Sequence, residues 1–231
     1  PSNSSAASDV YKRQVDTLIK GEKFVSRAVF SPDATQLLVD ASGEAFDGIG
    51  LKIKEGQTSN TSDGQLFLYN ITDKSIKPLT KDFDPSVDSY EWNALDKQIY
   101  IMAKDKDRVR MYSLNPSNGK IKQLQAKEDV ISDYSIANQA FEMVYFGLSA
   151  SNSQRLYTYN LKNDASSCLI DLSKEILRDV TLGEVQDWNF VSAQGDTIYG
   201  RFYLPPHFDA TKKYPMIVNY YGGTTPTARV M

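Results

Sequence analysis

The sequence contains a single cysteine, Cys168, and a single histidine, His207, among 231 residues. One cysteine excludes an intramolecular disulfide and any zinc site built from several cysteines. One histidine means that a serine–histidine–aspartate triad contained within these residues would have to use His207. The pattern G-x-S-x-G, which presents a nucleophilic serine at a sharp turn, is absent as well. These absences severely restrict the triad chemistry that these residues alone could perform.

Long apolar runs and an excess of one sign of charge are also missing. The longest apolar run has six residues, Met143 to Leu148, whereas a membrane-spanning helix needs about 20. The 26 basic and 29 acidic side chains give a net charge of −3, which provides no electrostatic reason to expect nucleic acid. No glycine-rich phosphate loop and no cluster of metal-ligating residues occurs in the sequence. We therefore expect no transmembrane helix, no nucleic acid partner, no metal and no cofactor.

Both ends of the sequence predict an internal fragment of a longer protein. It begins with Pro1 rather than Met, and no apolar segment typical of a signal peptide occurs near its start. The hexapeptide Asp9 to Gln14 resembles the translated end of a transposon adapter used for sequencing libraries. We expect residues 1–14 to be a non-native or disordered tail, and a flexible native terminus is the alternative. Localisation stays open: the periplasm or secretion is plausible, and nothing in the sequence excludes the cytoplasm.

Residues 24–172 consist of short β-rich runs separated by polar turns, and the same order of runs returns twice. Tyr69, Tyr112 and Tyr159 recur at intervals of 43 and 47 residues (112 − 69 and 159 − 112). These intervals are close to the roughly 40–50-residue period of four-stranded propeller blades. The pattern predicts three consecutive four-stranded antiparallel units with these tyrosines at equivalent positions. An ordinary β-sandwich with coincidental spacing is the alternative.

Three local features of this region receive interpretations of their own. An insertion rich in Gly, Ser and Asn separates Asp40 from Gln65 and is either a solvated loop or a functional loop at a propeller mouth. The alternating charges of Lys104 to Arg108 are typical of a solvated hairpin tip. Cys168 lies in an apolar run, which predicts a small buried side chain without catalytic function.

The pattern changes after residue 172. Two runs, Glu184–Val191 and Thr197–Leu204, predict a long hairpin. The later apolar run Met216–Tyr221 is ended by two glycines and predicts a strand buried on both faces, as in the central sheet of an α/β fold. We therefore place a domain boundary near residue 183, with residues 15–182 in one domain and residues 183–231 in another.

The segment from Glu184 to Gly223 resembles the domain junction of prolyl oligopeptidase family serine peptidases, particularly the dipeptidyl-peptidase-like branch. The resemblance is carried, in family order, by Gly195-Asp196, Leu204-Pro205-Pro206, Lys213-Tyr214-Pro215 and Tyr221-Gly222-Gly223. Upstream, Phe30-Ser31-Pro32-Asp33 resembles a piece of the family's propeller. The resemblance implies a mainly β fold, with a partial β-propeller of about three four-stranded blades in residues 15–182. The amino-terminal hairpin and first buried strand of a truncated α/β-hydrolase domain would follow in residues 183–231.

The resemblance also implies a role for Tyr221. In this family a tyrosine immediately before a pair of small residues donates its hydroxyl to the oxyanion, and Tyr221 occupies that position. Gly222 and Gly223 would allow the backbone to approach the substrate closely. Two alternatives stay open: Tyr221 only packs at a strand end, or Tyr220, which strand alternation points to the opposite face, is the donor.

The family's catalytic serine, aspartate and histidine would all lie downstream of this strand. The sequence therefore holds no nucleophile and no acid–base pair of the family, and His207, upstream of the strand, is not its catalytic histidine. The resemblance implies a fragment of a serine peptidase that cleaves short peptides through an acyl-enzyme and is inert alone. Short peptides would be the substrates, and oligomerisation stays open. A non-catalytic propeller serving as an interaction or envelope scaffold is the alternative, and an esterase of the same fold is a third interpretation.

Overall fold

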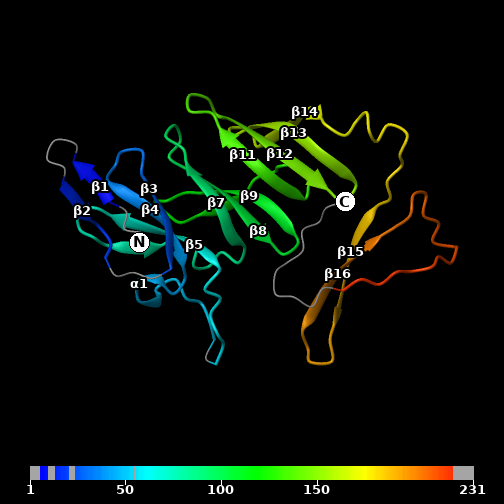
Figure 1. Cartoon of the computed structure of the whole chain (residues 1–231), viewed down its shortest axis with the longest axis horizontal. Coiled ribbons are helices and arrows are strands. Elements are labelled where there is room, and N and C mark those ends of the chain that lie inside the picture. Colours follow the sequence, from blue (N-terminus) through cyan, green and yellow to red (C-terminus); the bar gives the residue numbers. More distant parts are fainter. Residues whose placement is uncertain (1–5, 10–13, 21–23, 55, 221–231) are drawn as a thin grey trace. The chain divides into compact units, whose positions relative to one another are not determined.

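The computed structural model describes residues 6–9, 14–20, 24–54 and 56–220, and most of them lie in antiparallel β-strands or the turns between them (Figure 1). Contacts divide the chain into two compact units. The first unit contains Pro1–Asp105, Arg110–Leu124 and Asn138–Ala140. The second unit contains Lys106–Val109, Gln125–Ala137 and Phe141–Met231.

Three consecutive groups of four strands, the blades, occupy the region between Val25 and Asp171 (Figure 1). The first blade is a sheet of its own, and the second and third share one eight-stranded sheet through the parallel pairing of Val130 with Val109. The first blade contains β3 (Val25–Phe30), β4 (Gln36–Ser42), β5 (Gly64–Asn70) and β6 (Ile76–Pro78). The second contains β7 (Ser86–Trp92), β8 (Ile99–Asp105), β9 (Arg108–Leu114) and β10 (Ile121–Gln123). The third contains β11 (Val130–Ile136), β12 (Glu142–Ser149), β13 (Asn152–Asn160) and β14 (Ala165–Asp171). The predicted mainly β, propeller-type fold with three four-stranded units is confirmed.

An asparagine after the third strand marks the repeat. Asn70, Asn115 and Asn160 each accept, through the side-chain Oδ1, hydrogen bonds from the backbone N–H groups two and three residues ahead. These asparagines are 45 residues apart (115 − 70 and 160 − 115). Such side-chain-to-backbone bonds stabilise tight turns. The three turns are therefore equivalent, and the repeat is regular.

The predicted equivalence of the three tyrosines is wrong at one position. Tyr69 and Tyr159 directly precede the asparagine of their blade, whereas Tyr112 lies three residues before Asn115. Leu114, which is fully buried, occupies the equivalent place in the second blade. A buried strand position accepts an aromatic ring or a leucine side chain equally well. Matching tyrosine to tyrosine therefore shifted the predicted alignment of the second blade by two residues.

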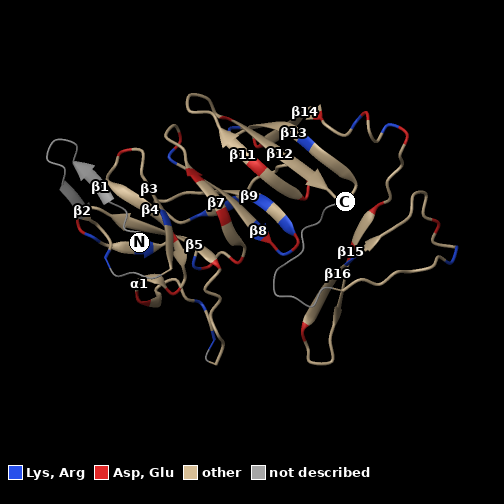
Figure 2. Cartoon of the chain, viewed as in Figure 1, with Lys and Arg blue, Asp and Glu red and all other residues tan. Residues whose placement is uncertain are grey.

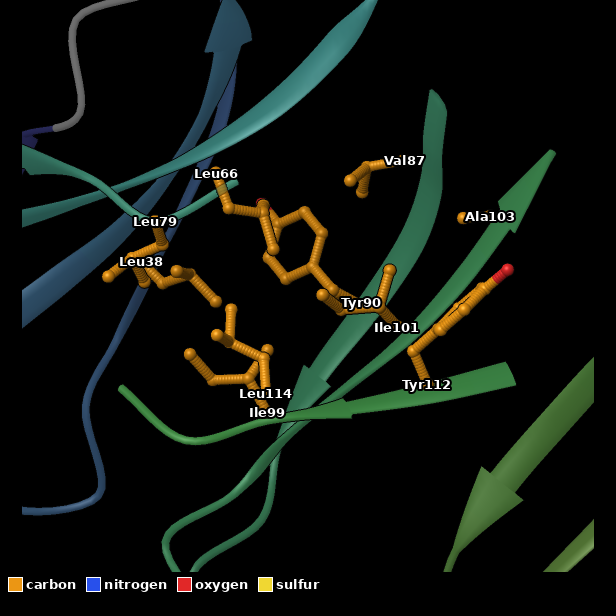
Figure 3. Packing of buried hydrophobic residues seen from close by; sticks show 10 residues of the cluster. All are labelled: Leu38, Leu66, Leu79, Val87, Tyr90, Ile99, Ile101, Ala103, Tyr112 and Leu114. Atoms are coloured by element: carbon orange, nitrogen blue, oxygen red, sulfur yellow. The ribbon is translucent and has the colours of Figure 1, made fainter. Parts of the chain in front are cut away.

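The core of the first unit lies between the first and second blades (Figure 3). Figure 3 shows side chains of β4 and β5 facing those of β7, β8 and β9, with the Tyr90 ring among them. In β4, Leu38 points into this cluster, while Leu37 and Val39 belong to a second buried cluster. Burial on both faces explains why Leu37, Leu38 and Val39 are consecutive apolar residues instead of alternating with polar ones. Each fully buried leucine or isoleucine contributes about 1.5–3 kcal/mol relative to exposure.

Residues near the amino terminus form a strand pair. β1 (Ala6–Asp9) pairs antiparallel with β2 (Gln14–Thr17). Ala6–Asp9, part of the expected tail, therefore have a pairing partner, and the backbone N–H and C=O groups of the two short segments satisfy one another. Val10 and Tyr11 lie outside the described residues.

The predicted hairpin after the blades is present as β15 (Val185–Val191) paired antiparallel with β16 (Thr197–Tyr203). Its turn contains Gly195 at a φ of 92°, a conformation that favours glycine. A side chain at Gly200 would place its Cβ 2.5 Å from the Trp188 ring, so the glycine allows the indole to lie across the partner strand. In the described ranges, no helix is long and apolar enough to cross a membrane.

Candidate functional site

The three residues that the sequence assigned to the site, Tyr221, Gly222 and Gly223, lie outside the described residues. The segment that precedes them is described but forms no strand. Ile217 is 95% exposed and Tyr220 is 88% exposed. The expectation of a strand buried on both faces is therefore not met here. A strand of that kind needs hydrogen-bonding neighbours, and none of the described strands pairs with residues 216–220.

The path from the hairpin to this segment is an ordered loop. Leu204 donates its backbone N–H to the carbonyl of Glu184, 2.9 Å away, and closes the base of the hairpin. Farther along, the Asp209 N–H donates to the Tyr214 hydroxyl at 3.0 Å, and the rings of Phe208 and Tyr214 lie 5.1 Å apart. His207 lies in this loop and is exposed. Its exclusion from catalysis stays a prediction.

Cys168 is exposed on β14, so the prediction of a buried cysteine is wrong. Among the described strands β14 has a partner on one side only, β13. Its side chains are mostly exposed, including Leu169 and Ile170. An apolar run predicts burial only where another layer covers the strand, and the described residues provide none over β14.

The insertion in the first blade lines one side of an open pocket, and most of its described residues between Lys52 and Ser62 are exposed, as expected of a solvated loop. It contains α1 (Ala45–Gly48), a single irregular turn, and it reaches β5 at Gly64. The pocket has a volume of about 310 Å³. Its lining comes from the insertion and from the segment after β6: Gly43, Leu51, Lys52, Ile53, Ser59, Asn60, Asp63, Gln65, Lys81, Asp82, Phe83 and Asp84.

The charged groups of this pocket are largely used by the protein itself. Lys52 forms an ion pair with Asp82 at 2.7 Å, and the Lys81 ammonium donates to the Ile49 carbonyl at 2.9 Å. Gln65 Oε1 is buried and accepts no hydrogen bond. A mixed lining of this kind defines no particular class of ligand.

A buried carboxylate that the sequence analysis missed lies in the third blade. The Glu128 side chain is 8% exposed, and it accepts hydrogen bonds from the Tyr157 hydroxyl, from Arg155 at 3.3 Å and from Asn152 Nδ2 at 2.8 Å. A Cβ at Gly147 would lie 2.9 Å from Glu128 Cγ, so the glycine provides the space. Three donors occupy the carboxylate. This geometry fits a structural group rather than a catalytic base.

Glu128 and its three donors form a cluster, and Arg155 connects this cluster to a carboxylate nearer the surface. Its Nε donates to Asp171 Oδ2 at 2.8 Å. This hydrogen bond, followed by one from Ser173, holds the pKa of Asp171 below its usual value. Burial raises the pKa of the Tyr157 hydroxyl, and the neighbouring Glu128 raises it further. Nothing in the sequence signalled this cluster, because its members come from separate strands and a connecting segment. Within the described ranges, no group of three or more His, Cys, Asp or Glu side chains could hold a metal ion.

The hairpin β15–β16 contacts the tip between β8 and β9, whose residues Lys106–Val109 belong to the same unit. Arg108 Nη2 donates to Asp187 Oδ2 at 2.9 Å, and Arg201 Nη1 donates to Asp107 Oδ2 at 3.1 Å. The interpretation of Lys104 to Arg108 as a solvated tip is therefore wrong for Asp107 and Arg108. Their side chains are each 24% exposed because the hairpin covers them.

The fold and these contacts define a β-propeller-type chain with an additional hairpin after its blades. Among known proteins, dipeptidyl-peptidase 5 of Porphyromonas gingivalis is 26% identical to the chain over 198 residues, which cover 86% of this chain and 27% of that protein. The chain thus spans about a quarter of the length of this curated relative. The resemblance to the prolyl oligopeptidase family is confirmed. No family model matches the sequence.

Solved structures show the same fold at lower identity. The acylaminoacyl peptidase of Pyrococcus horikoshii superposes with a TM-score of 0.62 at 16% identity, covering 92% of this chain and 32% of that one. The AtxE2 isopeptidase superposes with a TM-score of 0.63 at 12% identity, covering 97% of this chain and 32% of that one. The similarity in fold therefore extends over most of the chain.

Proposed function

We propose that this chain is part of a serine peptidase that hydrolyses peptide bonds in short peptides through an acyl-enzyme. The supporting observation is the match to dipeptidyl-peptidase 5 over 86% of the chain, which runs through most of the blades and the segment after them. The proposed contribution of the blades is to restrict access, so that only short or flexible peptides reach the catalytic groups. The separate two-stranded hairpin after the blades supports the proposed boundary near residue 183, although the compact unit that contains Phe141–Met231 spans this boundary.

Within this proposal, Tyr221 is the oxyanion donor, and Gly222 and Gly223 allow the backbone to pass close to the substrate. Attack on a peptide carbonyl develops negative charge on its oxygen. A preorganised hydroxyl donor in a water-poor site stabilises that charge by about 3–4 kcal/mol. The donor strengthens its bond as the charge develops, so it lowers the barrier more than it tightens substrate binding. The nucleophile and the acid–base pair are supplied by residues outside this chain, because the sequence has no G-x-S-x-G pattern and His207 precedes the segment.

The experiment is active-site labelling with a fluorophosphonate, which reacts with activated serines. The 231-residue chain alone should not be labelled and should not release the chromophore of a dipeptide-linked substrate. The full product of the gene that encodes this chain should be labelled on one serine and should turn over the substrate. Stoichiometric labelling of the 231-residue chain would contradict the proposal. A full gene product that neither reacts with the probe nor cleaves peptides would support the interaction scaffold instead.

A further inference from the structure

The tip between β8 and β9 and the hairpin β15–β16 have complementary charges. Asp107 and Arg108 are neighbours in sequence and have opposite signs, and Asp187 and Arg201 are directly opposed across the hairpin. Arg108 is paired with Asp187, and Asp107 is paired with Arg201. Both Asp107 and Arg108 therefore meet the opposite charge on the hairpin. Figure 2 shows charged residues of both signs gathered at the tip.

Two further contacts reinforce this four-charge cluster, which we define as Asp107, Arg108, Asp187 and Arg201. Arg108 Nε donates to Asp129 Oδ1 at 3.1 Å, so one guanidinium joins two carboxylates. Burial alone would lower the pKa of Arg108, but the hydrogen bonds to Asp187 and Asp129 outweigh it and raise the pKa. The Lys106 ammonium lies 4.4 Å from the centroid of the Tyr199 ring, within the range of a cation–π interaction.

Apolar packing contributes little to holding the hairpin. Trp188 stacks on Phe190 and Phe202, which belong to the hairpin itself. Phe190 is nevertheless 47% exposed and Tyr203 is 55% exposed. An isolated two-stranded hairpin is marginally stable in water. The hairpin therefore needs an external attachment. The cluster provides one whose Arg201 side chain is only 18% exposed.

We infer that Asp107 and Arg108 are positioning residues that attach the β15–β16 hairpin to the blade tip through the four-charge cluster. The attachment is electrostatic, and salt weakens it. Partly buried ion pairs are stronger than fully exposed ones, which contribute little. This inference does not depend on the peptidase proposal, because it concerns only contacts among the described residues of one unit.

Amide hydrogen exchange of the 231-residue chain, followed by mass spectrometry on peptides from residues 185–203, tests the attachment. Asp107→Asn and Arg201→Gln should each speed exchange of the hairpin amides about five- to tenfold, because detachment exposes a marginal hairpin. The acceleration in the double variant should be smaller than the product of the two single accelerations, since both substitutions remove the same pair. Raising NaCl from 0.05 to 1 M should speed exchange in the wild type more than in the double variant.

Two matched variants separate positioning from general destabilisation. Arg201→Lys keeps the charge that faces Asp107 and should restore most of the protection. Arg178→Gln removes a cation whose side chain is 68% exposed and should leave hairpin exchange unchanged. Amides of β12 and β13 should exchange at the wild-type rate in every variant, which shows that the third blade is intact. Three outcomes would each overturn the inference. The hairpin amides of the single variants could exchange within twofold of the wild-type rate, the two single accelerations could multiply in the double variant, or the amides of β12 and β13 could be accelerated as much as those of the hairpin.

Discussion

Tyr145 and Tyr157 stack face to face across β12 and β13, with ring centroids 5.0 Å apart and ring planes inclined by 9°. Their hydroxyls form hydrogen bonds with two consecutive residues, Lys127 and Glu128, of the segment before β11. The Tyr145 hydroxyl accepts the Lys127 N–H at 2.9 Å, and the Tyr157 hydroxyl donates to the Glu128 carboxylate. The stacked pair therefore fixes the segment that enters the third blade and satisfies its buried charge.

Tyr157→Phe should destabilise the third blade. The substitution keeps the stacked ring but leaves the buried Glu128 carboxylate without one of its three donors. Loss of a partner at a buried charged group costs about 1–3 kcal/mol. Urea unfolding should show this loss, whereas Tyr203→Phe, at a ring that is 55% exposed, should change stability by less than about 0.5 kcal/mol. Equal stability of the two variants would show that the Tyr157 hydroxyl is dispensable.

Replacement of Asn70, Asn115 or Asn160 by alanine should cost similar free energies. Each asparagine accepts two backbone N–H groups in an equivalent turn, and losing such bonds costs about 1 kcal/mol. Asn163→Ala is the control, because it lies in the third of these turns and only its backbone is used there. Thermal unfolding of the four variants makes the comparison. A control as destabilised as the three repeat variants would argue against this role.

Asp33 should titrate well below an ordinary aspartate. The hydrogen bond from the Ser31 hydroxyl, followed by those from the Thr35 backbone and side chain, lowers the pKa of Asp33 from 3.8 to about 2. Because the folded pKa lies below the unfolded value, the carboxylate contributes its full stabilisation above pH 3.8. This stabilisation is lost as the pH falls toward 2. The stability difference between wild type and Asp33→Asn should shrink over this interval, and an NMR titration midpoint near 3.8 for Asp33 would refute the assignment.

The blades could be predicted from the short-range pattern of apolar and polar residues. Alternating and apolar runs between polar turns identified the strands, because such signals depend on neighbouring residues. The turns contain a second repeat pattern, which the sequence analysis missed because it followed the tyrosines. Asn70, Asn115 and Asn160 are equally spaced, and each is followed three residues later by an Asp or Asn. Asparagine has a specific function in these turns, whereas a buried strand position accepts several apolar residue types.

Contacts between distant segments were not predictable in the same way. Asp107 and Arg201 are 94 residues apart in sequence, and only the folded chain shows that they pair. Glu128 likewise gains its donors from β13. Exposure of Cys168 depends on what covers β14, which no local pattern encodes. The proposed oxyanion donor Tyr221 rests on family resemblance, and it lies outside the described residues.

Substitution of Tyr221 by phenylalanine in the full gene product tests the proposed function most directly. The change keeps the ring and removes the hydroxyl donor, so kcat should fall on the order of 100- to 1,000-fold. Ground-state binding of the peptide should change far less, because the donor acts mainly on the developing charge. Tyr220→Phe is the matched control and should lower kcat by at most a few-fold. Equal losses in the two variants, or a Tyr221→Phe variant that mainly lowers Tm, would contradict the account.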